Sequence, residues 1–244
     1  MRKGASAALA TDVASNPSRT QRSKRPLGST KKSLKALIFD FDGLIVDSES
    51  PGYRAWTEVY EFHGCTLPFD KYSACIGTIG GFDLHGYLEE QAGRAFDRDE
   101  LEAACNLRWR ELVKHQPLLP GVAAIVSAAK GRGLQIAVAS SSTRRWVSGS
   151  LREFGILDRF DAICTRDDVA AVKPDPALYL LALEKLRVTA DEAIAFEDSP
   201  NGITAAKGAG IFCVFVPNPL MANVTSHLAD RRMNSLEEFD WDDV

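Results

Sequence analysis

The chain has 244 residues, of which 45% are hydrophobic and 25% charged, proportions typical of one large or two small globular domains. No apolar run reaches the roughly 20 residues that a membrane-spanning helix needs. The formal net charge of −4 is unevenly spread, because residues 1–33 carry eight Lys or Arg against one Asp and the remainder therefore carries −11. An acidic body of this kind argues against nucleic acid as the main partner.

The first 33 residues are basic, rich in Ser and nearly free of large apolar side chains. Such a segment cannot bury enough surface to offset its ordering entropy, so we expect it to be disordered. An organellar transit peptide has a similar composition and stays an alternative, whereas a secretory signal would need an apolar stretch after the charged start. Five widely spaced cysteines without a CxxC pair indicate neither a zinc site nor a disulfide framework and favour a cytoplasmic location.

From Leu34 onward, short apolar runs alternate with helical patterns. The alternation predicts a doubly wound, Rossmann-like α/β fold with a parallel sheet. Apolar runs without polar alternation suit strands that are covered on both faces. These predicted strands are residues 35–39, 134–140, 160–164, 192–197 and 211–216. The predicted helices between them are residues 121–133, 144–155, 176–187 and 200–210.

Residues 51–116 break the alternation. They contain three helical patterns and no strand signal, and they follow directly on the first predicted strand. An all-helical segment inserted there predicts a small cap domain over residues 51–116, with a core domain formed by residues 34–50 and 117–244. The helical patterns are residues 53–64, 81–93 and 98–115.

Two aspartates follow the first predicted strand. Asp40 and Asp42 are two positions apart, so their side chains leave the same face of the chain. Ligands bind at this carboxyl edge of open parallel sheets. Two carboxylates this close repel each other, so either a divalent cation keeps both charged or one carries a proton and can act as a general acid. Both arrangements suit phosphoryl transfer, whereas a turn with two solvated aspartates is the plain structural alternative.

Other polar residues follow the other predicted strands. Glu197 and Asp198 form a pair of hard oxygen ligands suited to Mg²⁺. Ser140 lies at a helix start, where an anion can bind, and Lys173 could neutralise a phosphate oxygen. Alone, each has an ordinary explanation as a helix cap or a solvated charge. Together with Asp40 they supply the parts that metal-assisted phosphoryl transfer through an aspartyl-phosphate requires.

These residues lie in four motifs that resemble those of the haloacid dehalogenase superfamily, over roughly residues 34–230. The helical insert resembles the small C1 cap of the subgroup that contains β-phosphoglucomutase and many sugar phosphatases. The resemblance implies a Mg²⁺-dependent phosphatase that acts on a small phosphorylated metabolite, such as a sugar or polyol phosphate, as a monomer or weak dimer. The motifs read DFDGLIVDS from Asp40 to Ser48, IAVASSS with Ser140, VKPDP with Lys173, and FEDSPNGI with Glu197 and Asp198.

The resemblance also implies a role for each motif residue. Asp40 would attack phosphorus and bind Mg²⁺. Asp42 would be the general acid and base, and its carbonyl would bind the metal. The remaining implied contacts are Ser140, Ser141 and Lys173 to the phosphoryl group, Glu197 and Asp198 to the metal, and Ser48, Gly77 and Arg144 to the substrate.

Residues that this sequence has or lacks argue against alternative reactions of the superfamily. Dehalogenases have no aspartate at the position of Asp42. Hexose-phosphate mutases carry a His where this chain has Gly52, and usually a cap Arg where residues 75–83 contain none. The mutase reaction is therefore less favoured than hydrolysis. A non-catalytic phosphate-binding protein on the same fold is the alternative from another class, although it would not need both aspartates.

Overall fold

The computed structural model describes Met1 and residues 33–76, 81–224 and 226–243. The prediction for the basic N-terminal segment concerns residues outside this description. A parallel sheet with the order β3-β2-β1-β4-β5-β6 lies at the centre of the fold, as predicted. Its strands are β1 (Ala36–Phe39), β2 (Gln135–Ala139), β3 (Ala162–Cys164), β4 (Ala193–Glu197), β5 (Phe212–Phe215) and β6 (Arg231–Arg232).

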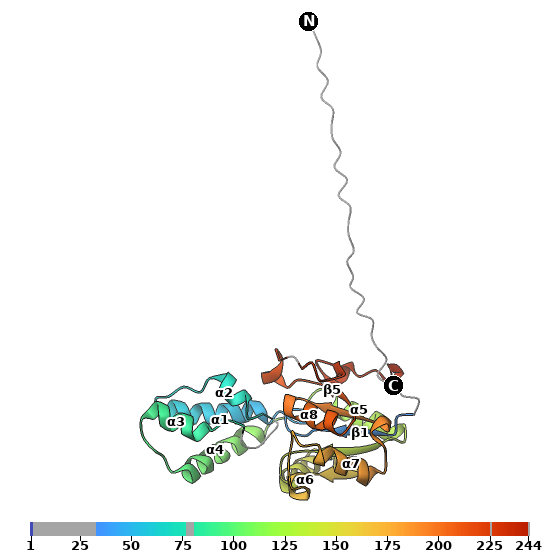
Figure 1. Ribbon diagram of the computed structural model, residues 1–244, viewed down its shortest axis with the longest axis horizontal. Helices are drawn as coiled ribbons and strands as arrows, with labels where there is room; N and C mark the ends of the chain where they lie inside the picture. The colour runs from blue at the N-terminus through green and yellow to red at the C-terminus, as the bar shows by residue number, and fades with distance from the viewer. Residues whose placement is uncertain (2–32, 77–80, 225, 244) are drawn as a thin grey trace.

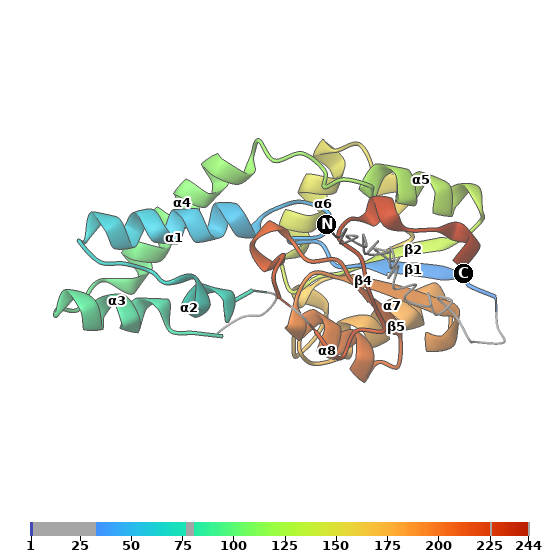
Figure 2. The same ribbon diagram turned by 90° about the horizontal axis from the view of Figure 1, so that it is seen from above.

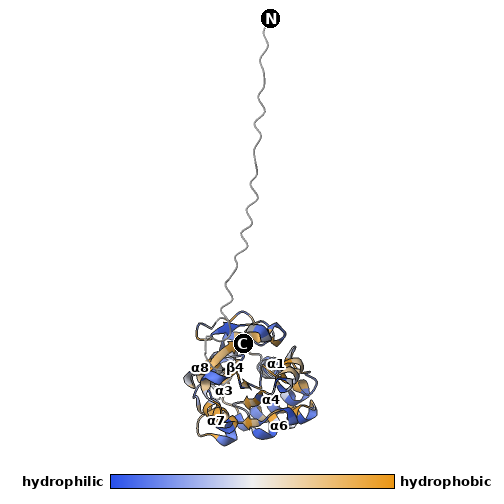
Figure 3. Ribbon diagram, turned by 90° about the vertical axis from the view of Figure 1, so that its right-hand side faces the viewer, coloured by the Kyte–Doolittle hydropathy of each residue, from blue (hydrophilic) through white to orange (hydrophobic). Residues whose placement is uncertain are grey.

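Helices cover both faces of this sheet (Figures 1 and 2). Leu37 and Phe39 of β1 face one apolar cluster, and Ala36 and Ile38 face another, because successive side chains of a strand alternate between its faces. Figure 3 shows that the surrounding helices carry hydrophobic as well as hydrophilic residues. The first cluster includes α5 (Val122–Gly131) and α6 (Arg144–Glu153), and the second includes α7 (Ala177–Leu186) and α8 (Pro200–Gly208).

The inserted helices form a separate group beyond one end of the sheet, here called the helical cap (Figure 2). They enclose an apolar cluster of their own around Trp56, Tyr60 and Leu88. The three predicted helices are present, while α2 is too short to give a periodic pattern. The cap helices are α1 (Glu49–Phe62), α2 (Phe69–Ser73), α3 (Leu84–Ala92) and α4 (Arg98–Val113).

The chain enters and leaves the helical cap at one place. Val46 and Leu118 form an antiparallel bridge, and the amide of Leu119 donates to the carbonyl oxygen of Ile45 at 2.9 Å. Elsewhere, Met221 of the core packs into the cap cluster.

Within the described part of the chain, no helix has the length and hydrophobicity needed to cross a membrane. Short 3₁₀ helices are η1 (Leu157–Arg159), η2 (Arg166–Asp168), η3 (Ala190–Glu192), η4 (Pro219–Met221), η5 (Leu236–Glu238) and η6 (Trp241–Asp243).

Candidate functional site

The sequence-predicted residues meet at the carboxyl end of the sheet. Asp40 follows β1, Ser140 follows β2, and Glu197 is the last residue of β4. Phe39 of β1 pairs with Val138 on one side and Phe196 on the other, so the ends of these three strands are level. The apolar residues of each strand are thus buried in the core, and a polar residue lies at the carboxyl end of each strand, at the same edge of the sheet.

Lys173 lies at the centre of the site and is almost fully buried, with 1% of its side chain exposed. Its Nζ lies 2.7 Å from Oδ1 of Asp40 and 2.5 Å from Oε1 of Glu197. Burial lowers the pKa of Lys173, but the two carboxylates outweigh it and raise the pKa above its ordinary value. The ammonium group is therefore held charged between two acids, where a phosphoryl oxygen could also reach it.

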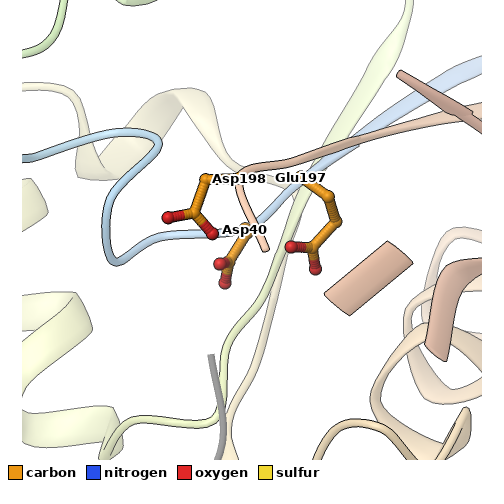
Figure 4. Close-up of side chains that lie close together, drawn as sticks. All are labelled: Asp40, Glu197 and Asp198. Carbon is orange, nitrogen blue, oxygen red and sulfur yellow. The ribbon is translucent and has the colours of Figure 1, made fainter. Parts of the chain in front are cut away.

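Three carboxylates gather beside this lysine. One oxygen from each of Asp40, Glu197 and Asp198 lies within 4.8 Å of the others, and all three side chains are buried (Figure 4). Burial, followed by repulsion from Glu197, raises the pKa of Asp40 to about 7 despite the nearby lysine. Burial and the same neighbouring acids also raise the pKa of Asp198. Such a cluster is stable in its charged form only with additional positive charge.

The cluster also fits a hard cation in detail. Oε2 of Glu197 and Oδ1 of Asp198 are buried without a hydrogen-bond partner within the described residues. Carboxylate oxygens left in this way are the ligands that Mg²⁺ prefers. Mg²⁺ bound among these three acids would supply positive charge that keeps them ionised and polarises a phosphoryl oxygen.

Two glycines and an asparagine shape the acidic cluster. A Cβ at Gly43 would lie 2.0 Å from Oδ2 of Asp198, and Gly43 has a φ of +77° that favours glycine. A Cβ at Gly202 would lie 1.9 Å from Oε2 of Glu197. The buried Asn218 donates through Nδ2 to Oδ2 of Asp198 at 2.6 Å. These residues fix where the carboxylates can lie.

Asp42 occupies the turn after β1 and is held by several donors. The hydroxyl of Ser48 donates to Oδ1 at 2.8 Å, and the hydroxyl of Ser142 donates to Oδ2 at 2.6 Å. Ser140 lies 3.4 Å from the same Oδ2 and accepts a hydrogen bond from the amide of Ser142. The predicted phosphate-binding hydroxyl of Ser140 therefore also belongs to the surroundings of Asp42.

A pocket with a volume of about 1000 Å³ opens over these groups between the core and the helical cap. Ser141 and Ser142 line it, and the hydroxyl of Ser141 is buried without a partner among the described residues, which leaves it available to a ligand. Lining residues that come from the cap are Glu49, Gly52, Trp56, Tyr72, Cys75, Glu102, Cys105, Asn106, Trp109 and Arg110.

The three predicted substrate contacts have different positions. Ser48 lines the pocket, whereas Gly77 lies outside the described residues. The guanidinium of Arg144 is already bound, through Nη2, to Oδ2 of Asp168 at 2.6 Å and to the carbonyl oxygen of Ile163 at 3.0 Å. Its neighbour Arg145 lines the pocket instead. A substrate role for Arg144 would require this ion pair to open.

Sequence reasoning missed two residues that hold the predicted carboxylates by hydrogen bonds. Tyr179 donates to Oε1 of Glu197 at 2.5 Å, and Trp146 donates to Oδ1 of Asp42 at 2.9 Å. Both lie on helices whose periodic patterns mark them as ordinary helix residues. Gly202 had a visible signal, because a glycine in the first turn of a helix, after Pro200, is unfavourable unless a close approach requires it.

Comparison with known proteins gives a consistent result. The family model described as "Haloacid dehalogenase-like hydrolase" matches residues 37–216. "Putative phosphatase YhcW" of Bacillus subtilis is 45% identical over 85% of this chain and 94% of its own length. Hexitol phosphatase B of Escherichia coli is 33% identical over 86% of this chain and 96% of its own length. The crystal structure of CbbY from Rhodobacter sphaeroides in complex with phosphate has a TM-score of 0.69 and 31% identity, covering 84% of this chain and 96% of that one.

Proposed function

Because the chain belongs to the haloacid dehalogenase-like hydrolase family, we propose that it is a Mg²⁺-dependent phosphatase of small sugar or polyol phosphates. One observation carries the proposal: a buried lysine joins Asp40 to Glu197 next to two unpartnered carboxylate oxygens. A site that must hold a phosphoryl group and a divalent cation needs this combination of charges. The names of the relatives, a hexitol phosphatase among them, support the substrate class.

The proposed reaction has two steps. A bond forms between an oxygen of Asp40 and phosphorus while the bond from phosphorus to the alcohol oxygen breaks, and a proton from Asp42 passes to that alcohol oxygen. Water then bonds to phosphorus and returns a proton to Asp42 as the Asp40–phosphorus bond breaks. Lys173 and the hydroxyl of Ser141 would hold the phosphoryl oxygens throughout. Asp40, Glu197 and Asp198 would hold Mg²⁺, with the carbonyl of Asp42 as a further ligand.

The mutase alternative finds little room in this site. A side chain at Gly52 would begin with a Cβ 2.3 Å from the hydroxyl oxygen of Tyr72. An imidazole therefore cannot replace this glycine unless Tyr72 moves. The absence of a histidine at this position, with the hydroxyl of Tyr72 in the space that its side chain would enter, supports hydrolysis over transfer back to a sugar.

Phosphate release from sugar, polyol and nucleotide monophosphates, with Mg²⁺ and with EDTA, tests the proposal. We expect release that depends on Mg²⁺ and is concentrated on one or two sugar or polyol phosphates. Asp40→Asn should lower kcat at least about 1000-fold, because it removes the nucleophile. Asp158→Asn, at an exposed aspartate of η1 outside the pocket, is the matched control. Full activity of the Asp40 variant would overturn the mechanism, and no release from any compound by folded protein would overturn the function.

A further inference from the structure

The carboxyl group of Asp42 is fixed from two sides. Its Oδ1 accepts from the hydroxyl of Ser48 at 2.8 Å and from Nε1 of Trp146 at 2.9 Å. Its Oδ2 accepts from the hydroxyl of Ser142 at 2.6 Å and faces that of Ser140 at 3.4 Å. The serine contacts come from segments that the sequence motifs already mark. The indole comes from outside those motifs and is the unexplained member of the set.

The indole of Trp146 is itself held in place. The backbone amide of Trp146 donates to the hydroxyl of Thr143, the N-cap of α6. Its ring packs edge-on against Phe41 of the core, with centroids 5.9 Å apart and planes at 85°. On the cap side it meets Trp109 of α4, with centroids 4.8 Å apart. A ring that is clamped by the core and by the cap presents its N–H in a defined direction.

The chemistry of the two kinds of donor differs. An indole N–H can donate but never accept, whereas a serine hydroxyl can do either. An Asp42 that carries a proton cannot direct it toward Trp146, so one of the two contacts of Oδ1 always stays a donor, whereas both contacts of Oδ2 are hydroxyls that can accept. The proton is therefore favoured on Oδ2. The hydroxyl of Ser142 can reverse its direction, so Oδ2 can carry the proton and deliver it into the pocket that Ser142 lines.

We propose that Trp146 is a positioning residue for the proton transfer by Asp42, which it achieves by holding Oδ1 as an acceptor and leaving the proton on Oδ2. The inference rests on the proposed phosphatase reaction, in which the proton of Asp42 passes to the alcohol oxygen as the phosphorus–oxygen bond breaks. Trp146 touches neither the phosphoryl group nor the alcohol in this scheme, so its influence is confined to how well Asp42 is aimed.

Substrates with different leaving groups can distinguish a role of Trp146 in proton transfer from a merely structural role. A sugar or polyol alkoxide needs a proton as it departs, whereas p-nitrophenolate is stable enough to leave without one. General acid catalysis contributes about 10²–10⁴-fold, so misdirecting the acid should cost part of that factor with an alcohol only. We expect Trp146→Phe to lower kcat/KM about 10-fold or more for the preferred sugar phosphate, and less than about 3-fold for p-nitrophenyl phosphate. The kcat/KM values include only steps up to loss of the leaving group, so later hydrolysis does not blur the comparison.

Two further variants make the test specific. Trp241→Phe removes an indole N–H from η6, outside the pocket, so the ratio of the two kcat/KM values should stay at the wild-type level. Replacing Trp146 by 3-benzothienylalanine keeps the shape of the ring and removes only the N–H, so it should change the ratio as Trp146→Phe does. Equal losses with both substrates, or no loss with either, would overturn the inference alone. No turnover by the unaltered chain would overturn the proposed function and the inference together.

Discussion

Glu49 is the first residue of α1 and brings another acid to the pocket that Asp40 and Asp42 line. Burial, followed by repulsion from Asp42, Asp40 and Asp47, raises the pKa of Glu49 from 4.5 to about 8. Because this pKa is higher in the folded than in the unfolded chain, the folded state binds the proton more tightly. The corresponding stability is fully present below pH 4.5 and is lost as the pH rises toward 8.

Glu49→Gln should therefore change stability in a way that depends on pH. Without Mg²⁺, we expect the variant to match the wild type near pH 4.5 and to exceed its free energy of unfolding above pH 8. Part of the effect is screened in a solvent-lined pocket, so about 1–2 kcal/mol is expected. Urea unfolding in EDTA at several pH values measures the difference, with Glu184→Gln at an exposed position of α7 as the control. A difference that does not change with pH would contradict the assignment.

The residue-level predictions differ in what the sequence could reveal. Asp40 and Asp198 could be identified because each directly follows a strand inside a motif, and Lys173 because it precedes a helix inside another motif. Trp146 and Asn218 could not, because only the folded chain brings an indole from α6 and an amide from the loop after β5 to these carboxylates. A hydrogen bond between residues 104 positions apart, as for Trp146, or 20 apart, as for Asn218, leaves no local pattern.

At the level of elements, α8 depends on a glycine in its first turn. Gly202 allows the carboxylate of Glu197 to lie against the helix backbone, where a Cβ would overlap it. We expect Gly202→Ala to destabilise the fold by about 1–3 kcal/mol and to lower activity by displacing Glu197 from Lys173. Thermal unfolding and phosphate release measure both effects.

The matched control is Gly131→Ala at the end of α5. A Cβ there meets nothing within 4 Å, so the substitution should be neutral or stabilising by up to about 1 kcal/mol. If the two variants behaved alike, close packing against Glu197 would not be the reason for Gly202.

Some helices and strands could be predicted from the sequence and others could not. The five buried strands were predictable because an apolar run covered on both faces looks unlike any neighbouring segment. The strand β6 escaped because Arg231 and Arg232 form a two-residue edge strand, which carries no apolar run. The helix α2 has only one turn, which is too short for a 3.6-residue period to be recognised. Elements that are very short, or that lack an apolar run, could therefore not be predicted.

For the whole molecule, we expect the acidic cluster to couple metal binding to folding. Since the three carboxylates meet only in the folded chain, Mg²⁺ should stabilise it by about 2.7 kcal/mol at a concentration 100 times its Kd. Asp198→Asn should raise stability in EDTA by relieving repulsion, and should weaken the response to Mg²⁺. Differential scanning calorimetry with Mg²⁺ and with EDTA follows both. Equal Mg²⁺ responses in the two proteins would place the ion elsewhere.

The single crossing of the chain at Val46 and Leu118 has a consequence for folding. For the folding of the core, the whole helical cap acts as one long loop, and the two ends of this loop lie next to each other in the structure. The entropy of closing such a loop grows only with the logarithm of its length, by about 0.6 kcal/mol for each doubling. The core therefore tolerates a cap of almost any size at little cost. Apart from residues such as Ser48, which holds Asp42, the sequence between these two positions can diverge with the substrate while the sheet and its carboxylates stay unchanged.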